Sequence, residues 1–311
     1  VTGSARVVDV RCEDLINPLG VDTARPKLSW RMASSAQGAA QTAYQILVAS
    51  DPKLLSEDEA DLWNTGKVVS AMSRLISYGG TQLPRGRYHY WRVRIWDETG
   101  AASEWSRPGN WTSFDLHQNK DWKAQWIQVS DKLPQGRDRS SPWLRKTFQL
   151  KDVPARGMIY VNSLGYFQLF INGQRVGKDE FTPHVAQYNK RTLCITYDVT
   201  SYLQKGANSI GLWLGAGWSQ YKIGLHLKSP AVRAQLEIDS ENQPITLVCT
   251  DTSWRGRPSY LAYLGGWSHR NFGGEIYDAG RDHIPWADTL FDDSSWLPVS
   301  PAAVADTPVS S

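Results

Sequence analysis

Hydrophobic and polar residues alternate with a period of two along most of this chain. Between residues 91 and 95, Trp91, Val93 and Ile95 alternate with Arg92 and Arg94. Successive side chains of a β-strand point to opposite faces of a sheet, so this pattern predicts a strand with one buried and one solvated face. Similar segments recur throughout the sequence between turns rich in Gly, Pro, Asn and Asp, and long segments with a helical period are missing. The pattern therefore predicts an all-β protein.

Residues 1–116 contain the first group of predicted strands. The segment YQILVAS at 44–50 alternates in the same way, and residues 98–100 supply a hairpin turn. Short strands, a buried tryptophan on an early strand and the late W-R-V-R-I strand predict a fibronectin type III or immunoglobulin-like sandwich. A helical turn or two is expected only after Asp51 and Pro52, which suit an N-cap and a first helical turn.

Residues 122–300 form the second predicted domain. Asn172 and Gly173 supply the positive φ angles of a type I′ turn after an alternating segment, the strongest short hairpin signal that a sequence offers. Further apolar strands lie between Gly, Pro, Asn and Asp turns, which fits an antiparallel β-sandwich of jelly-roll type. Residues 117–121 are predicted to form a short polar linker, and residues 301–311 a polar tail.

Composition excludes several classes of function. The 311 residues include 34 Lys and Arg against 31 Asp and Glu, a net charge of +3 without a basic block, whereas nucleic-acid binding needs a concentrated positive face. No apolar run is long enough to span a membrane. The three cysteines lack metal-ligand spacing, and a Cys194–Cys249 disulfide stays open. We therefore expect no nucleic-acid partner, no membrane span and no cofactor.

Two sets of segments occur in a fixed order along the chain. The first domain contains NPLGVDTARPKLSW, QTAYQILVAS, DLWNTGKV and YWRVRIWDETGAASEWS. The second domain contains DWKAQWI, YVNSLGYFQLFINGQRVG, TYDVTSYLQKGANSIGLWLGAGW and GGEIYDAG. Taken together, these segments resemble the N-terminal half of bacterial α-L-rhamnosidases of glycoside hydrolase family 78. The resemblance implies a longer protein, in which an (α/α)₆ barrel follows the sandwiches and carries the catalytic acids. Nothing in this chain resembles that barrel.

Some relatives in this family bind rhamnose through calcium in the second domain. The family commonly has Pro-Gly-Trp-Thr-Asp-Tyr where this chain reads PHVAQY at 183–188, and Gly-Asn/Asp-Gly-Trp where it reads GAGW at 215–218. Calcium takes about six to eight oxygen ligands, with carboxylates prominent. Because this chain lacks the family's oxygen ligand at both places, no metal site is expected.

The candidate contact residues lie in loops of the second domain, where they could meet a carbohydrate or a neighbouring domain: His184, Trp218, Tyr221, Trp267 and Arg270. Trp218 and Tyr221 follow a glycine-rich strand end that leaves an aromatic face free for a sugar or a partner, although a core tryptophan fits equally well. His184 follows a proline, and a structural or interfacial role is favoured over ligand contact. Trp267 and Arg270 lie in a glycine-rich segment, interpreted as a loop that locks against a following domain, where Arg270 could instead hold a sugar hydroxyl or a carboxylate.

These features indicate the non-catalytic accessory domains of an enzyme that hydrolyses terminal α-L-rhamnose. The expected partners are the catalytic domain of the same polypeptide and a rhamnose-containing carbohydrate. Acidic residues fall mostly in turns, so no catalytic residue is expected in this chain. Two alternatives are a free-standing carbohydrate-binding protein and a structural or adhesion module pair, because tandem sandwiches are compatible with both. We expect export in a bacterium, to the periplasm or the cell surface.

Overall fold

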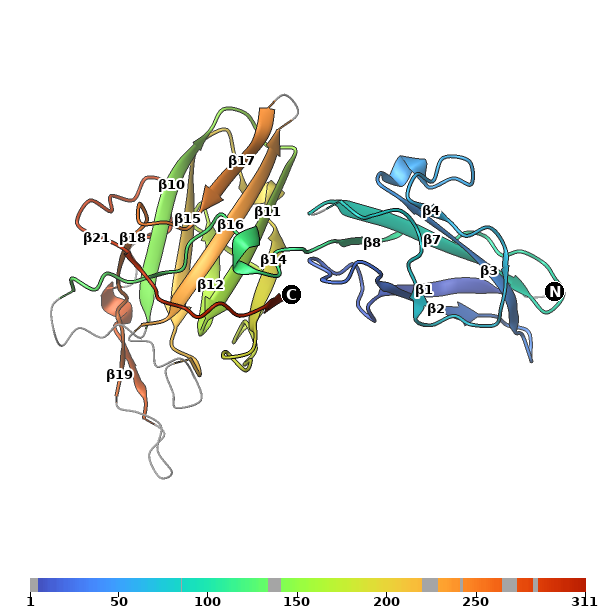
Figure 1. Cartoon of the computed structure of the whole chain (residues 1–311), viewed down its shortest axis with the longest axis horizontal. Coiled ribbons are helices and arrows are strands. Elements are labelled where there is room, and N and C mark those ends of the chain that lie inside the picture. The colour runs from blue at the N-terminus through green and yellow to red at the C-terminus, as the bar shows by residue number, and fades with distance from the viewer. Residues whose placement is uncertain are drawn as a thin grey trace. The chain divides into compact units, whose positions relative to one another are not determined.

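The chain forms two separate units with almost no helix. The computed structural model describes residues 5–84, 86–133, 141–219, 229–240, 243–264, 273–281 and 285–311. The units are Val1–Asp115 and Leu116–Ser311. Within the described ranges the helices are short 3₁₀ turns, namely η1 (Pro52–Leu54), η2 (Asn119–Asp121), η3 (Thr200–Tyr202) and η4 (Ala279–Arg281). The predicted all-β class is confirmed, and Figure 1 shows it as strands throughout both units.

The first unit is an immunoglobulin-like sandwich of two sheets. One sheet has the strand order β1 (Arg6–Cys12), β2 (Lys27–Ala33) and β6 (Ile76–Ser77). The other has the order β4 (Trp63–Asn64), β3 (Gln41–Ala49), β7 (Tyr88–Asp97) and β8 (Gly109–Thr112), with β5 (Val68–Val69) also paired to β3. Side chains from both sheets share one buried core, which includes Leu28, Trp30, Ile46, Val48, Trp91, Val93, Ile95 and Trp111.

Strand β7 shows why the alternating pattern was informative. Its burial alternates residue by residue, with Trp91, Val93 and Ile95 in the core. Arg92 and Arg94 point the other way, and each guanidinium carbon lies 4.7 Å from the ring centroid of Trp105. The polar face of the strand is thus partly covered by cation–π stacking.

The second unit is a jelly-roll-type sandwich of a six-stranded and a seven-stranded sheet. The six-stranded sheet has the order β13 (Gln174–Val176), β12 (Tyr166–Ile171), β15 (Gly206–Gly215), β10 (Pro142–Leu150), β18 (Arg255–Pro258) and β21 (Leu297–Pro298). The seven-stranded sheet has the order β22 (Ser300–Pro301), β9 (Ile127–Gln128), β16 (Ala231–Ser240), β11 (Arg156–Leu164), β14 (Thr192–Asp198) and β23 (Val309–Ser310), with β17 (Gln243–Cys249) on β16. A small hairpin, β19 (Leu261–Tyr263) with β20 (Glu275–Tyr277), projects from one end of this unit (Figure 1).

The two sheets of the second unit enclose an aliphatic core. Leu144, Ile210 and Leu212 contribute to it from the six-stranded sheet, and Ile159 and Leu236 from the seven-stranded sheet. Burial of such side chains stabilises each by about 1.5–3 kcal/mol relative to exposure, so this core is the main stabilising element of the unit.

The hairpin turn between β12 and β13 is confirmed. Asn172 and Gly173 have φ angles of 51° and 80°, and Ile171 pairs with Gln174 across them. The side chain of Asn172 accepts a hydrogen bond from the backbone N–H of Ser209 (2.7 Å) and donates to the side chain of Asn208 (2.9 Å). The turn is therefore also tied to the neighbouring strand β15.

Both segments that the sequence analysis placed outside the second domain belong to it in the structure. Ser300 and Pro301 pair with β9, and Val309 pairs with Thr192 in parallel, so residues 301–311 extend the seven-stranded sheet instead of forming a tail. Residues 117–121 include η2 and lie within the second unit instead of bridging the two units. The backbone N–H of Val309 donates to the carbonyl of His117 at 2.9 Å, which joins these two segments. These pairings are made by backbone groups, and a sequence pattern of side chains does not reveal them.

Cys12, Cys194 and Cys249 are free thiols. The Cys194–Cys249 disulfide that the sequence left open is therefore not formed. Among the described residues, no helix has the length and apolar character needed to cross a membrane.

Candidate functional site

The outer face of the six-stranded sheet carries an unusual set of side chains. In β10, Leu144 points into the aliphatic core, so its neighbours Trp143 and Arg145 point outward. Trp213 of β15 pairs with Trp143, and Phe170 of β12 pairs with Gly211, which places aromatic rings on the same outer face. This face is built from aromatic and guanidinium groups, whereas the inner face is aliphatic.

A segment far along the chain covers the aromatic part of this face. Trp286 stacks on Trp143 with ring centroids 5.1 Å apart and planes 9° from parallel, and Phe170 meets Trp286 edge-on at 5.3 Å. Gly211 permits this approach, because a Cβ there would lie 2.8 Å from the Trp286 ring. Trp296 completes the layer, 6.3 Å from Trp143. Aromatic pairs of this kind are worth about 0.5–1.5 kcal/mol each beyond burial, so the covering segment is firmly packed.

Arg145 fixes the same segment through its guanidinium group. The side chain is 1% exposed and forms an ion pair with Asp293. It also donates hydrogen bonds to the carbonyl oxygens of Phe291 (3.2 Å) and Asp288 (2.7 Å). Arg255 approaches the other carboxylate oxygen of Asp293 at 3.7 Å. The charge on Arg145 is thus neutralised and held in a fixed geometry.

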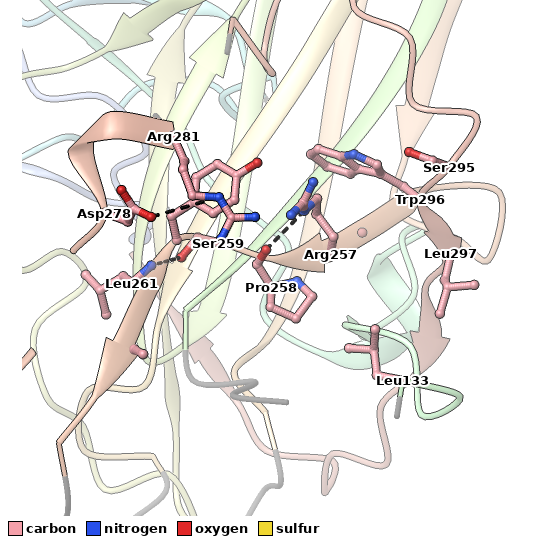
Figure 2. Close-up of a pocket in the computed structure, with 13 residues that line it drawn as sticks. Leu133, Arg257, Pro258, Ser259, Leu261, Asp278, Arg281, Ser295, Trp296 and Leu297 are labelled. Carbon is pink, nitrogen blue, oxygen red and sulfur yellow. Dashed lines mark hydrogen bonds and ion pairs between the residues drawn. The ribbon is translucent and has the colours of Figure 1, made fainter. Parts of the chain in front are cut away.

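A pocket of about 560 Å³ opens beside this aromatic layer. Sites for small molecules have volumes of roughly 300–1,000 Å³, so it is large enough for a small ligand. It is lined by residues of β18, the β19–β20 hairpin, η4 and the stretch before β21, including Arg257, Tyr260, Asp278, Arg281 and Trp296. Figure 2 shows Arg257 and Arg281 extending toward each other from β18 and η4.

The charges around this pocket are unevenly balanced. The guanidinium carbons of Arg257 and Arg281 lie 5.0 and 4.7 Å from the ring centroid of Tyr260. Arg281 forms a long ion pair of 3.9 Å with Asp278, and both side chains are about half exposed or more. Arg257 forms no ion pair with any described residue, and the one hydrogen bond that its side chain makes to the described residues goes from Nε to the carbonyl of Pro258 at 3.2 Å. The described lining therefore carries two positive groups and one negative group.

His184 and Trp218 lie in loops that flank the beginning of β12. Trp218 is 40% exposed in the turn after β15, where the adjacent Gly217 packs against Gly165 and Tyr166. His184 is exposed and lies two residues after Thr182, whose carbonyl accepts a hydrogen bond from β12. The two residues thus sit in loops on either side of the beginning of β12.

A smaller hollow of about 240 Å³ lies along the same end of β12 and β15. Phe181 is 73% exposed there and meets Tyr166 edge-on at 5.7 Å. Arg175 pairs with Glu180 at 2.9 Å, and its hydrogen bond holds the pKa of that carboxyl below its ordinary value. The hollow therefore combines an exposed ring with two carboxylates, Glu180 and Glu275, and the lowered pKa of Glu180 keeps that carboxylate ionised.

Three of the predicted contact residues, Tyr221, Trp267 and Arg270, lie outside the described residues. The described part of the chain contains no group of three His, Cys, Asp or Glu side chains that could hold a metal ion. Arg257, Tyr260 and Arg281 were not among the site residues predicted from the sequence. The run RGRPSY at 255–260 does offer a signal, because arginine alternates with small residues just before an aromatic ring.

Comparisons with known proteins identify the family. Residues 152–311, more than half of the chain, match the family model of the alpha-L-rhamnosidase N-terminal domain. The chain belongs to the alpha-L-rhamnosidase N-terminal domain family. Residues 7–113 match a further family model, the Rha78A-like N-terminal immunoglobulin domain. The family resemblance that the sequence suggested is confirmed in both domains.

Individual alpha-L-rhamnosidases are similar to this family member along nearly its whole length. An alpha-L-rhamnosidase from Formosa agariphila is 33% identical over 310 residues, which is 95% of this chain but 32% of that protein. One from Alteromonas sp. is 32% identical over 296 residues, 91% of this chain and again 32% of the relative. The solved structure of the enzyme from Dictyoglumus thermophilum superposes with a TM-score of 0.85 at 30% identity, over 97% of this chain and 34% of the other. The chain thus spans about a third of the length of these relatives.

Proposed function

We propose that this chain is the non-catalytic N-terminal part of an α-L-rhamnosidase, joined in one polypeptide to the domain that hydrolyses the rhamnoside. The observation that supports this proposal is the share of each relative's length that the chain spans. They match nearly the whole chain, but the match takes up only 32% of each. Both matching families are named for N-terminal domains, so the remaining two thirds of such a protein would supply the chemistry.

The pairing of carboxylates that line the larger pocket and the smaller hollow supports this proposal. Glycoside hydrolysis commonly uses two carboxyl groups roughly 5–9.5 Å apart across the scissile bond. Asp278 is the one acidic residue among the described residues that line the larger pocket, and it is paired with Arg281. Two carboxylates, Glu180 and Glu275, line the smaller hollow. Glu180 is paired with Arg175, and its lowered pKa does not suit a general acid at neutral pH.

An activity assay on two forms of the protein tests this proposal. We expect the 311-residue chain to leave p-nitrophenyl α-L-rhamnoside intact, and the same chain joined to its downstream segment to hydrolyse it. A mixture of the separate parts would show whether the covalent link is needed. Turnover by the purified chain that rises in proportion to its concentration and co-elutes with it in gel filtration would overturn the proposal.

Contact with a rhamnose-containing carbohydrate is a second part of the proposal. The exposed rings of Phe181 and Trp218 support it, because aromatic faces suit the apolar faces of a pyranose. One or two exposed rings give little net affinity, so we expect a Kd for rhamnose no tighter than about 1 mM. Saturable NMR shifts lost in Trp218→Ala would support sugar contact. If no shifts occur and Trp218→Ala relieves dimerisation, this end of β12 is a docking surface instead. Export to the periplasm or cell surface of a bacterium stays a prediction, which fractionation of the source organism would test.

A further inference from the structure

The larger pocket of the second unit has features that the scaffolding role does not require. Arginines elsewhere on the outer face of the six-stranded sheet are matched with acid, since Arg145 and Arg255 share Asp293. Arg257 follows Arg255 by two residues on the same strand and has no carboxylate partner among the described residues. A guanidinium left unpaired in a pocket needs a different explanation from one that locks two segments together.

Arg257 is held in place and yet keeps its binding end available. Its Nε donates to the carbonyl of Pro258, and its guanidinium carbon lies 5.0 Å from the Tyr260 ring and 6.0 Å from the Trp296 ring. These contacts leave the two terminal amino groups without a hydrogen-bond partner among the described residues. A planar pair of N–H donors in a fixed orientation matches the two oxygens of a carboxylate.

Arg281 adds a second positive charge on the same ring. Its guanidinium carbon lies 4.7 Å from the centroid of Tyr260. The ion pair with Asp278 is long at 3.9 Å, and the Arg281 side chain is 65% exposed, so this pair only weakly offsets the charge. An anion near Tyr260 would be attracted by both guanidinium groups.

The rest of the lining suits a sugar ring. Leu133, Leu261 and Leu297 supply apolar surface, and Ser259 and Ser295 supply hydroxyl groups. Figure 2 shows Ser259 and Leu261 on the Arg281 side of the pocket, and Leu133, Ser295 and Leu297 on the Arg257 side. Apolar patches combined with a few polar groups are what the two kinds of surface on a pyranose require.

We infer that this pocket binds a uronate, a sugar residue that carries a carboxylate, with Arg257 as the residue that binds the carboxylate. The inference rests on the carbohydrate setting of the proposed function, and it identifies an acidic sugar as a component of the polymer that the whole protein would meet. Its test needs no hydrolytic activity, so its failure is distinguishable from failure of the accessory-domain proposal.

The test is a calorimetric titration of the 311-residue chain with three ligands. Sodium D-glucuronate has both ring and carboxylate, D-glucose has the ring alone, and acetate has the carboxylate alone. We expect saturable glucuronate binding with a Kd of about 1–10 mM, and at least about tenfold weaker binding of the other two. Equal binding of glucose would make the pocket a neutral sugar site, and equal binding of acetate would make it a plain anion site. Either result, or no saturation up to about 50 mM glucuronate, would overturn the inference.

Variants locate the binding on Arg257. Arg257→Gln should weaken glucuronate binding at least about tenfold, and Arg257→Lys, which keeps the charge but loses the paired donors, by an intermediate factor. Arg281→Gln should weaken glucuronate binding by a few-fold. Because the Arg281 side chain is exposed, this variant should fold normally. Arg191→Gln removes an exposed arginine that immediately precedes β14 in the same unit, and it should leave affinity unchanged. If Arg191→Gln weakens binding as much as Arg257→Gln, the binding is unspecific and the assignment fails.

Discussion

The two sheets of the second unit each bury an arginine on the outer face, and they accommodate its charge in opposite ways. Arg145, on the six-stranded sheet, is paired with the carboxylate of Asp293 and bonded to two backbone carbonyls. Arg233, on the seven-stranded sheet, is 2% exposed and has no ion-pair partner within the described structure. Two arginines that are almost fully buried therefore differ in their partners. Arg145 is paired with a carboxylate, and Arg233 has no carboxylate partner among the described residues.

Aromatic rings take the place of the missing acid around Arg233. Its guanidinium carbon lies 4.4 Å from the Trp122 ring and 4.8 Å from the Trp126 ring, and it donates one hydrogen bond of 2.5 Å to Asn119. All three partners belong to the segment that the sequence analysis assigned to the linker and the start of the domain. Burial lowers the pKa of Arg233 to about 10, with the Cys194 thiol and Asp306 opposing the shift, so the group is still charged at neutral pH.

The comparison shows two ways to attach a covering segment to a sheet. The 286–296 segment is held by a charge pair with strict geometry, and the 116–126 segment by stacking that tolerates small shifts. Loss of one partner from a buried ion pair leaves an uncompensated charge, whereas loss of a stacked cation leaves two rings that can still pack on an apolar group. Substitution at the two arginines should therefore have very different effects.

Arg145→Met should have the largest effect on stability. It leaves Asp293 with only the more distant Arg255 and removes the donors to the carbonyls of Phe291 and Asp288. We expect a loss of about 3–5 kcal/mol in the free energy of unfolding, because one partner of a buried pair is removed. Urea unfolding followed by tryptophan fluorescence measures it, with the exposed Arg191→Met as a matched control. A loss below about 1 kcal/mol would show that the aromatic layer alone holds the segment.

The difference between the two faces also explains what the sequence could reveal. Alternation along β10 places Leu144 on one face and Trp143 and Arg145 on the other, since side-chain direction in a strand depends only on neighbouring positions. It does not reveal that both faces are buried, because the covering rings arrive from Trp286 and Trp296, more than a hundred residues later.

Local signals were reliable in the same way elsewhere in the chain. Asp51 caps η1 by accepting a hydrogen bond from the backbone of Lys53 at 2.8 Å, as its place before Pro52 predicts. The pocket around Arg257 was not predicted, because it is assembled from four stretches that meet only in the folded unit. Contacts between residues that are close in sequence can be predicted from local patterns. Contacts between residues that are far apart in sequence cannot.

The first unit buries a basic group in a third way, by keeping it neutral. His89 on β7 is 1% exposed, and its Nε2 lies 2.9 Å from the hydroxyl of Ser113. Burial lowers its pKa to about 4, while the carbonyl of Pro84 and the charge of Asp61 act in the opposite direction. An unfolded histidine titrates near pH 6.5, so between about pH 6.5 and pH 4 the unfolded chain binds more protons than the folded one.

Stability of the first unit should therefore fall as pH is lowered through that window. We expect a loss that reaches about 3 kcal/mol near pH 4, and a much flatter profile in His89→Gln, which cannot become charged. Urea unfolding of both proteins at a series of pH values gives the two profiles. The lowered pKa values of Asp61 and Asp97 affect stability mainly below this window, so they do not mask it. Parallel profiles for the two proteins would show that His89 does not carry the effect.

Gly211→Ala tests whether shape as well as charge holds the 286–296 segment. The added methyl would lie 2.8 Å from the Trp286 ring and 3.1 Å from Ala287, so the segment must move outward. We expect a loss of about 1–3 kcal/mol from overpacking. The stack of Trp286 on Trp143 should also loosen, which near-ultraviolet circular dichroism would detect. Gly38→Ala is a control for the replacement of a glycine itself, since a Cβ added at Gly38 would have nothing within 4 Å. The φ of 76° at Gly38 adds some backbone strain to this control. Equal losses in both variants would mean that the approach of Trp286 is adjustable.

Arg233→Met should have the smallest effect, within about 1 kcal/mol of the parent protein in either direction. The methionine removes a desolvated charge and keeps an unbranched side chain that can pack between Trp122 and Trp126. Asn119 is only half-buried, so its side chain can turn to water.

Lysine distinguishes the two sites more clearly than methionine does, because its ammonium group is more strongly hydrated and stacks less well than a guanidinium. At Arg233 we expect Lys to be less stable than Met, because Lys restores the buried charge without the planar stacking. At Arg145 we expect the reverse order, because Lys restores a charge that Asp293 needs. Urea unfolding of the four variants measures both orders, and the same order at both sites would show that the two faces do not differ in how they hold their arginine.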